Sequence, residues 1–202
     1  MKICLVAPAN NAHTRRFINV LIQHGYQVAL ISPQPVQAAL PPEVELFDLS
    51  RLSNLPRLRF LAWRAALPGL LRRVQPDLLH AFGAAGASWL ASAAHFHPFV
   101  ITAMGSDLLL LGQRSWLHNR LTRQALHQAD YLLCLSEGLR QAALGLGTPA
   151  ERCEVAFFGL DLQVFHPGNG PATERQRAGL PDQPTILSLR AVQPVYNPLS
   201  IA

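Results

Sequence analysis

Residues 129–137 read Ala-Asp-Tyr-Leu-Leu-Cys-Leu-Ser-Glu, an apolar run of strand length that ends at a serine. A serine hydroxyl accepts a hydrogen bond from the free amides of a helix start, and a carboxylate in the first turn suits the helix dipole. The run therefore predicts a buried strand over 131–135, after which Ser136 and Glu137 begin a helix. A strand that passes directly into a helix is the repeating unit of α/β proteins.

The same alternation extends over the rest of the chain. Short apolar runs predict strands at 3–7, 28–31, 44–49, 78–82, 99–103 and 154–158, with 44–49 at an edge of the sheet. Apolar residues at helical spacing predict helices at 14–24, 55–74, 84–94 and 116–128. Pro68 is expected to kink or break the second helix, and residues 148–151 are expected to form a capping box. These elements predict an α/β fold with a doubly wound, mostly parallel sheet.

Towards the C-terminus the pattern changes. The chain leaves the last predicted strand through Gly159 and Pro167, and residues 166–184 are rich in proline and glycine. The sequence from Thr185 to Arg190 then has the pattern of a new buried strand. We therefore predict a first domain over 1–165, a linker over 166–184 and the truncated start of a second domain over 185–202.

The composition indicates a globular protein. Half of the 202 residues are apolar and 14% are charged, with a net charge of +5 that suits an anionic ligand, an anionic membrane surface or a nucleic acid. No long run of basic residues occurs, so we expect no nucleic-acid partner. The three cysteines lie in or beside apolar runs, which favours buried, reduced thiols in a cytoplasmic protein. The apolar stretch after Lys2 ends at Pro8, unlike a signal peptide.

Two stretches invite a membrane interpretation. Residues 78–106 carry no Asp, Glu, Lys or Arg, but histidines, glycines and a proline interrupt them, so a strand, a helix and a second strand explain them better. Residues 57–73 place five arginines among leucines and aromatic residues. That pattern fits a helix lying on an anionic membrane, and it also fits the commoner case of a helix covering a sheet. Peripheral membrane contact therefore stays open.

Ligands of doubly wound sheets bind beyond the carboxyl ends of the strands, which directs attention to the first strand-to-helix loop. This loop is not a Gly-x-Gly-x-x-Gly sequence, so a nicotinamide-dependent dehydrogenase is not expected. His13, Thr14 and Arg16 stand where a helix begins, and a helix N-terminus favours an anion. The alternative is that His13 or Thr14 only caps the helix and that Arg16 is solvated.

A second group of candidates follows two other strands. Gly105 lets the backbone approach a ligand closely, and Ser106 and Asp107 can bind sugar hydroxyls or can simply cap a helix. Ser136 and Glu137 also follow a strand, and their alternative role is that of a helix cap.

Several motifs, taken in this order, resemble glycosyltransferase family 4. The segment from Ala129 to Arg140 is similar to the family's Ala-Asp-x5-Ser-Glu helix start, and Pro76 to Ala81 is similar to its Pro-Asp-x-x-His strand, which includes His80. Residues 159–167 resemble its Gly-Val-Asp-x3-Phe-x-Pro segment, with Phe158 where asparagine is usual. Residues 190–197 resemble the opening of the second domain in one subgroup. Met104 stands where the family often has histidine.

The resemblance implies a two-domain GT-B fold that transfers a sugar from a nucleotide-sugar to a glycan, lipid or small-molecule acceptor with retention at the anomeric carbon. The N-terminal domain mainly holds the acceptor, and the C-terminal domain holds the nucleotide and bears two glutamates. It implies no metal and no cofactor beyond the nucleotide-sugar. On this basis His13 and Asp107 are predicted as catalytic residues. The predicted donor- or acceptor-binding residues are Thr14, Arg16, His80, Gly105, Ser106, Ser136 and Glu137.

Because the predicted donor half is missing from the 202 residues, we expect this chain to be inactive alone. Two other functions stay open. One is a sugar-binding or regulatory half-protein without catalysis. The other is a different nucleotide-sugar enzyme such as an epimerase, since a fold does not fix a function.

Overall fold

The computed structural model describes residues 1–37, 39–52, 56–159, 162, 166, 175–180 and 183. The chain divides into two compact units, Met1–Phe158 and Gly159–Ala202. In the second unit, the described residues include one helical turn at 175–177, closed by a hydrogen bond from the Leu180 amide to the Arg175 carbonyl. The predicted linker and second domain lie mostly outside the described residues, so that division stays a prediction.

The first unit is built on one seven-stranded sheet in which every neighbouring pair of strands is parallel. The strand order is β3-β2-β1-β4-β5-β6-β7. The strands are β1 (Lys2–Val6), β2 (Gln27–Ser32), β3 (Glu45–Asp48), β4 (Leu78–Phe82), β5 (Phe99–Ala103), β6 (Tyr131–Cys134) and β7 (Cys153–Val155). The predicted parallel α/β sheet is thus confirmed, with β3 at an edge.

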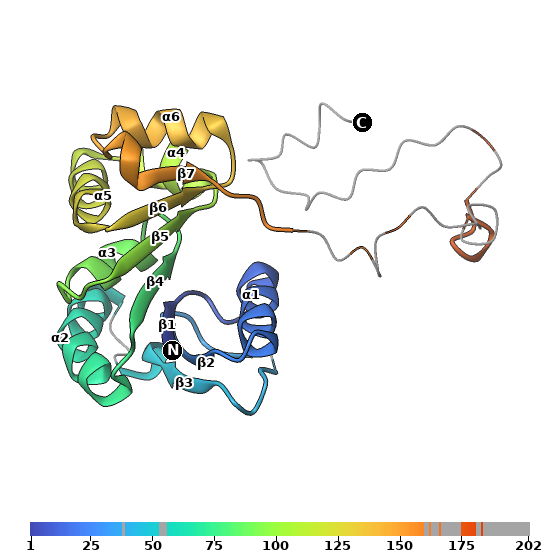
Figure 1. The fold of residues 1–202 in the computed structure, drawn as a ribbon, viewed down its shortest axis with the longest axis horizontal. Coiled ribbons are helices and arrows are strands. Elements are labelled where there is room, and N and C mark those ends of the chain that lie inside the picture. Colours follow the sequence, from blue (N-terminus) through green and yellow to red (C-terminus); the bar gives the residue numbers. More distant parts are fainter. Residues whose placement is uncertain are drawn as a thin grey trace. The chain divides into compact units, whose positions relative to one another are not determined.

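Helices cover both faces of this sheet (Figure 1). They are α1 (Ala12–Gln23), α2 (Pro56–Val74), α3 (Ala87–Ser92), α4 (Ser106–Leu109), α5 (Trp116–Gln128) and α6 (Glu137–Gly145), with short 3-10 turns η1 (Leu49–Leu52), η2 (Leu111–Gln113) and η3 (Ala150–Arg152). Helix α1 packs on one face, where Ile18 and Leu21 meet Leu5 and Leu30. Helices α2, α3, α5 and α6 pack on the other face.

The two cores, one on each face of the sheet, explain why the strands appear in the sequence as continuous apolar runs. Side chains alternate along a strand, so Ile3 and Leu5 face α1 while Cys4 and Val6 join the opposite core. Because both faces are covered, nearly every residue of β1 and β2 is buried. Cys4, Cys134 and Cys153 are buried and free, as predicted, and burial raises the pKa of Cys4 and of Cys134 to about 12.

Two local predictions were wrong. The helix expected over 84–94 is confined to Ala87–Ser92, because Gly83 and Gly86 have φ of 112° and 71° and the chain must turn before the helix starts. Residues 148–151 form no capping box. Instead η3 begins after Pro149 without a side-chain cap, and the Thr148 hydroxyl is buried without a partner among the described residues. Pro68 lies within α2, so of the two expected outcomes the helix is not broken there, and the kink stays a prediction.

None of the helices that the structure describes is long and apolar enough to cross a membrane.

Candidate functional site

The carboxyl ends of β1, β4 and β5 lie side by side, and the strand order reverses between β1 and β4. Such a reversal separates the loops that follow the two strands and opens a crevice for ligands. The loop from β1 leads into α1, the loop from β4 into α3, and the loop from β5 into α4. His13, Thr14 and Arg16, which follow β1, therefore lie at the same edge of the sheet as Gly105, Ser106 and Asp107, which follow β5. Ser136 and Glu137 follow the neighbouring strand β6 at that edge.

The start of α1 combines an open helix N-terminus with basic side chains. Asn11 caps the helix by accepting a hydrogen bond from the His13 amide at 2.8 Å, so neither His13 nor Thr14 is the cap. The first turn contains no acidic residue, and His13 and Arg16 lie one turn apart on the same side of the helix. Arg16 forms no ion pair with the described residues. An anion at this end meets the positive end of the helix dipole and the Arg16 guanidinium together.

Thr14 takes a different position from its neighbours. Its side chain is fully buried, and its hydroxyl has no hydrogen-bond partner among the described residues. A buried hydroxyl without a partner costs about 1–3 kcal/mol. Its predicted role in binding stays a prediction, and no other role for the hydroxyl follows from its contacts.

A row of aromatic rings runs inward from the start of α1. His13 stacks on Phe158 with ring centroids 5.0 Å apart, and Phe158 lies 6.0 Å from Phe82. Phe82 in turn packs against Phe17 and His80 at 4.9 Å. The row links the segment after β7 to the first turns of α1 and to β4, and it fixes the position of the His13 ring at the start of α1.

His80 lies at the inner end of this row rather than at its surface. Its side chain is only 4% exposed, and its Nε2 lies 2.8 Å from the Thr102 hydroxyl on the neighbouring strand. Burial lowers the pKa of His80 to about 3, so the ring is neutral near pH 7. The structure gives His80 a partner in the core, and contact with a ligand stays a prediction.

Asp107 is held by backbone amides from two loops. Its Oδ2 accepts a hydrogen bond from the Ala84 amide at 2.5 Å, and its Oδ1 accepts one from the Gly105 amide at 2.6 Å. The Met104 amide bridges both oxygens at 3.1 and 3.2 Å. The carboxylate therefore ties the loop after β4 to the loop after β5. Gly105 can enter the α4 turn because its φ is 138°, which a residue with a side chain rarely adopts.

The candidates near β6 have local partners. Ser136 caps α6, accepting from the Leu139 amide at 3.2 Å, as its sequence context predicted. Glu137 accepts hydrogen bonds from Gln141 and Arg140 on the same helix, and these contacts, that of Gln141 first, lower the pKa of Glu137. Ser106 is exposed beside Asp107 and takes part in the first turn of α4. All three side chains lie near the edge of the sheet, with Ser106 and Ser136 open to solvent.

An apolar cavity of about 340 Å³ opens at the same edge. It is enclosed by the loops after β1, β2 and β4 and by parts of α2, α3 and η2. The residues around it are mostly aromatic or aliphatic: Pro8, Pro33, Gln34, Phe60, Trp63, Phe82, Ala85, Gly86, Ala87, Trp89, Leu90 and Leu111. A larger cavity of about 640 Å³ lies beside the edge strand β3, which is two strands away from β1. Only the smaller cavity reaches the point where the strand order reverses.

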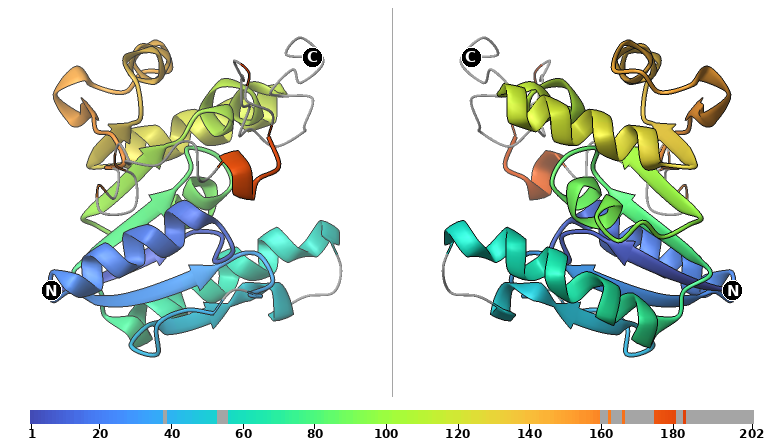
Figure 2. Two further views of the ribbon diagram at one scale, coloured as in Figure 1. Left: turned by 90° about the vertical axis from the view of Figure 1, so that its right-hand side faces the viewer. Right: turned by 90° about the vertical axis from the view of Figure 1, so that its left-hand side faces the viewer.

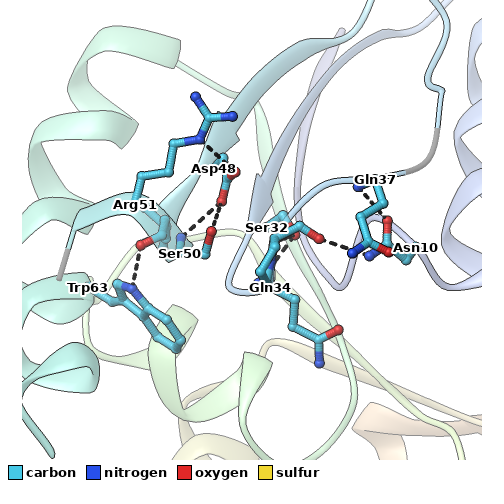
Figure 3. A network of polar contacts seen from close by, with 10 residues as sticks. Asn10, Ser32, Gln34, Gln37, Asp48, Ser50, Arg51 and Trp63 are labelled. Carbon is cyan, nitrogen blue, oxygen red and sulfur yellow. Dashed lines mark hydrogen bonds and ion pairs between the residues drawn. The ribbon is translucent and has the colours of Figure 1, made fainter. Parts of the chain in front are cut away.

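Polar contacts fix the loops around the apolar cavity (Figure 3). The Asn10 side chain bonds the Pro35 carbonyl at 2.8 Å and the Gln37 amide at 2.9 Å, which joins the loops after β1 and β2. The indole of Trp63 donates to the Leu49 carbonyl at 2.7 Å, so one aromatic wall of the cavity is anchored to η1. The cavity walls are thus held in place by hydrogen bonds between loops that are distant in the sequence.

The sequence prediction missed the residues of this cavity. The sequence pattern assigns Phe60 and Trp63 to an amphipathic helix and Trp89 to the helix predicted over 84–94. Nothing in their spacing distinguishes a cavity wall from a core contact, because the two faces meet only when α2 and α3 pack together. The one available signal was the presence of two tryptophans in segments that begin at the carboxyl edge.

Comparison with known proteins gives a family and a fold. Residues 2–136 match the family model described as glycosyl transferase 4-like. No curated protein sequence matches the chain significantly. Among solved structures, HepE from Anabaena in complex with UDP is similar with a TM-score of 0.62 and 20% identity, over 89% of this chain and 50% of that chain.

Two further structures share the architecture. Sucrose-phosphate synthase from Thermosynechococcus elongatus has a TM-score of 0.64 and 16% identity, over 91% of this chain and 54% of that chain. UDP-GlcNAc 2-epimerase from Neisseria meningitidis, bound to UDP-GlcNAc, has a TM-score of 0.56 and 15% identity, over 77% and 46% of the two chains. At these identities the likeness concerns the fold. The chain spans about half the length of the solved structures that it matches.

Proposed function

Because the chain belongs to the glycosyl transferase 4-like family, we propose that it forms the acceptor-side part of an enzyme that transfers a sugar from a nucleotide-sugar. We propose further that transfer retains the configuration at the anomeric carbon and that the enzyme works in the cytoplasm, where buried free thiols persist. The observation that carries the proposal is the carboxyl edge of the sheet, where an apolar cavity lies beside an open helix N-terminus.

The two parts of this edge suit two parts of the reaction. The start of α1, with His13 and Arg16, suits the anionic phosphates of a nucleotide-sugar. The cavity walled by Trp63 and Trp89 suits an apolar portion of the acceptor, because aromatic surfaces bind apolar groups and the flat faces of sugar rings. A lipid-linked acceptor can place its apolar chain in this cavity, and a glycan acceptor can place the flat face of a sugar ring there.

Asp107 takes a supporting role in this scheme. With three amides on its carboxylate, it holds the loops after β4 and β5 at the spacing that the acceptor meets. The exposed hydroxyls of Ser106 and Ser136 are then the side chains available to a sugar hydroxyl on this edge. Retaining transfer can use the departing phosphate to accept the acceptor proton, so no residue of this chain is assigned as the base.

The donor nucleotide is assigned to a second α/β domain, which residues 185–202 would begin. Matched proteins of about twice this length that are solved with UDP or UDP-GlcNAc support this division. Holding donor and acceptor together accounts for a large share of catalysis in such a reaction. Residues 1–202 alone are therefore expected to transfer no sugar at a useful rate.

The experiment compares the protein encoded by the whole open reading frame with residues 1–202. Each is incubated with labelled nucleotide-sugars, UDP-glucose first, and with lipid and glycan extracts of the host, and labelled acceptor is measured. We expect transfer by the longer protein and none by 1–202. Robust transfer by 1–202 would contradict the division between two domains. A longer protein that only epimerises the nucleotide-sugar, or only binds sugar, would overturn the proposed activity.

A further inference from the structure

Large apolar side chains are exposed at the start of α2 and along the segment that runs from the end of α4 through η2 to the start of α5. Trp116 is 75% exposed, Leu61 is 62% exposed and Leu110 is 57% exposed. The other exposed leucines of these two segments are Leu58, Leu109, Leu111 and Leu117. Single exposed leucines are common on protein surfaces, but several within two short segments mark a binding surface. We call these seven residues the apolar rim.

The two segments lie at the same edge of the sheet. Crossover helices run antiparallel to the strands, so α2 and α5 both begin at the carboxyl edge, as Figure 2 shows. The cavity of about 340 Å³ joins them, because Phe60 and Trp63 of α2 and Leu111 of η2 all belong to its walls. Leu111 of the apolar rim is thus itself part of the cavity wall, and Leu61 of the rim is the sequence neighbour of the wall residue Phe60.

The charges around the rim have one sign. The sequence contains no Asp or Glu between Asp48 and Asp77, or between Asp107 and Asp130. Arginines lie close to these side chains. Arg120 lies over the ring of the rim residue Trp116 at 5.8 Å, and Arg64 lies over the ring of the cavity residue Phe60, next to Leu61 in the sequence, at 5.9 Å. Arg114 is exposed between the leucines and Trp116. The surface is thus apolar and cationic, with no carboxylate on either helix.

We propose that this surface binds an anionic lipid bilayer, with the apolar rim inserted among the acyl chains and the arginines among the headgroups. Tryptophan prefers the depth of the headgroups, and arginine can extend its guanidinium to the lipid phosphates while its stem stays apolar. Anionic lipid strengthens such binding through each arginine near the surface. The cavity then opens towards the membrane, where the apolar part of a lipid acceptor is found.

Other partners fit this surface less well. Two copies of the chain facing each other here would place arginines against arginines, which opposes association. A nucleic acid would satisfy the arginines but would leave the exposed leucines against phosphates and water. A bilayer with anionic headgroups satisfies both the apolar and the cationic side chains.

The test measures co-sedimentation of the full chain with vesicles. One set is pure phosphatidylcholine, and the other is a mixture of phosphatidylcholine and phosphatidylglycerol. We expect binding to the mixed vesicles that weakens at high salt, and much weaker binding to the neutral ones. The variant Trp116→Ser with Leu117→Ser should bind roughly tenfold or more weakly, because two apolar side chains no longer enter the membrane. Arg114→Gln with Arg120→Gln should weaken binding to the mixed vesicles severalfold and leave binding to neutral vesicles unchanged.

Matched controls come from α1, which lies on the opposite face of the sheet. Val20→Ser removes an apolar side chain that is 41% exposed, and Arg15→Gln removes an exposed arginine. Both controls should bind the vesicles as the parent does, and circular dichroism should show every variant folded.

Failure to bind mixed vesicles, or equal losses in the α1 controls, would overturn the proposal. So would dimerisation or RNA binding that the Trp116 and Leu117 substitutions abolish while vesicle binding persists. The outcome does not depend on sugar transfer, since vesicle binding is measured without a donor.

Discussion

Replacing Asp107 by alanine should lower the free energy of unfolding by about 3–5 kcal/mol. Hydrogen bonds to a charged group each contribute about 1.5–3 kcal/mol, and the loss is smaller than the sum of three because Asp107 is half-buried and water can partly replace its carboxylate. The amides of Ala84, Met104 and Gly105 would all lose their acceptor. Urea unfolding followed by circular dichroism measures the change. In an active full-length protein that remains folded, turnover should fall roughly 100-fold, the usual scale for loss of one organising hydrogen-bond group.

Two further variants test whether the loss of stability comes from the Asp107 carboxylate itself. Asp107→Asn retains one acceptor oxygen and should lose roughly half as much stability. Asp130→Ala is the matched control, because the Asp130 carboxylate accepts from a single backbone amide, that of Phe99 at 2.7 Å, and from the exposed His97. Asp130→Ala should lower the free energy of unfolding clearly less than Asp107→Ala does. If Asp107→Ala unfolds like the parent and Asp130→Ala does not, the carboxylate does not tie the two loops together.

The second large effect is a dependence of stability on acid that originates at His80. The pKa of His80 is lowered by burial to about 3, whereas the pKa of a histidine in the unfolded chain is near its ordinary value of 6.5. A group whose pKa is lower in the folded state stabilises the fold above its unfolded pKa and loses that contribution as the pH falls towards its folded pKa. Between pH 6.5 and pH 3 the free energy of unfolding should therefore fall by roughly 1.4 kcal/mol per pH unit from this group alone.

A pair of substitutions isolates this contribution. His80→Leu removes the titrating group but leaves the Thr102 hydroxyl without its partner at 2.8 Å, so His80→Leu is combined with Thr102→Val. Replacing both partners by apolar groups of similar size can be nearly neutral at pH 7. The double variant should be less sensitive to acid than the parent between pH 6.5 and pH 4. An unchanged slope would mean that the histidine is protonated in the folded state.

The sequence predicted the regular elements of the first unit well, for a physical reason. Strands buried on both faces must be apolar throughout, so β4 and β5 were predicted at the residues where they occur, and α5 was predicted from its spacing. The errors fell where backbone conformation decides the outcome. The Thr148 hydroxyl resembled a cap in the sequence but is buried in the turn after α6, and α3 is shortened by Gly83 and Gly86.

The candidate site was predicted in its location but not in its contacts. The rule that ligands bind at the carboxyl ends of strands selected His13, Arg16 and Asp107 from the sequence. Their positions depend on contacts between residues far apart in the chain, such as the hydrogen bond of Asp107 with Ala84 and the ring stacking of His13 on Phe158. Local patterns contain no information on such pairs. The aromatic cavity was missed for the same reason.

The measurement that tests the account most directly is the turnover of the full-length protein with Arg16→Ala, compared with Arg15→Ala. Arg16 lies on the same side of α1 as His13, whereas Arg15, two residues from His13, does not face it. If the start of α1 binds the anionic part of the donor, Arg16→Ala should reduce turnover roughly 100-fold while Arg15→Ala stays close to the parent. Near-normal turnover of a folded Arg16→Ala variant, or equal losses in both variants, would contradict this assignment of the site.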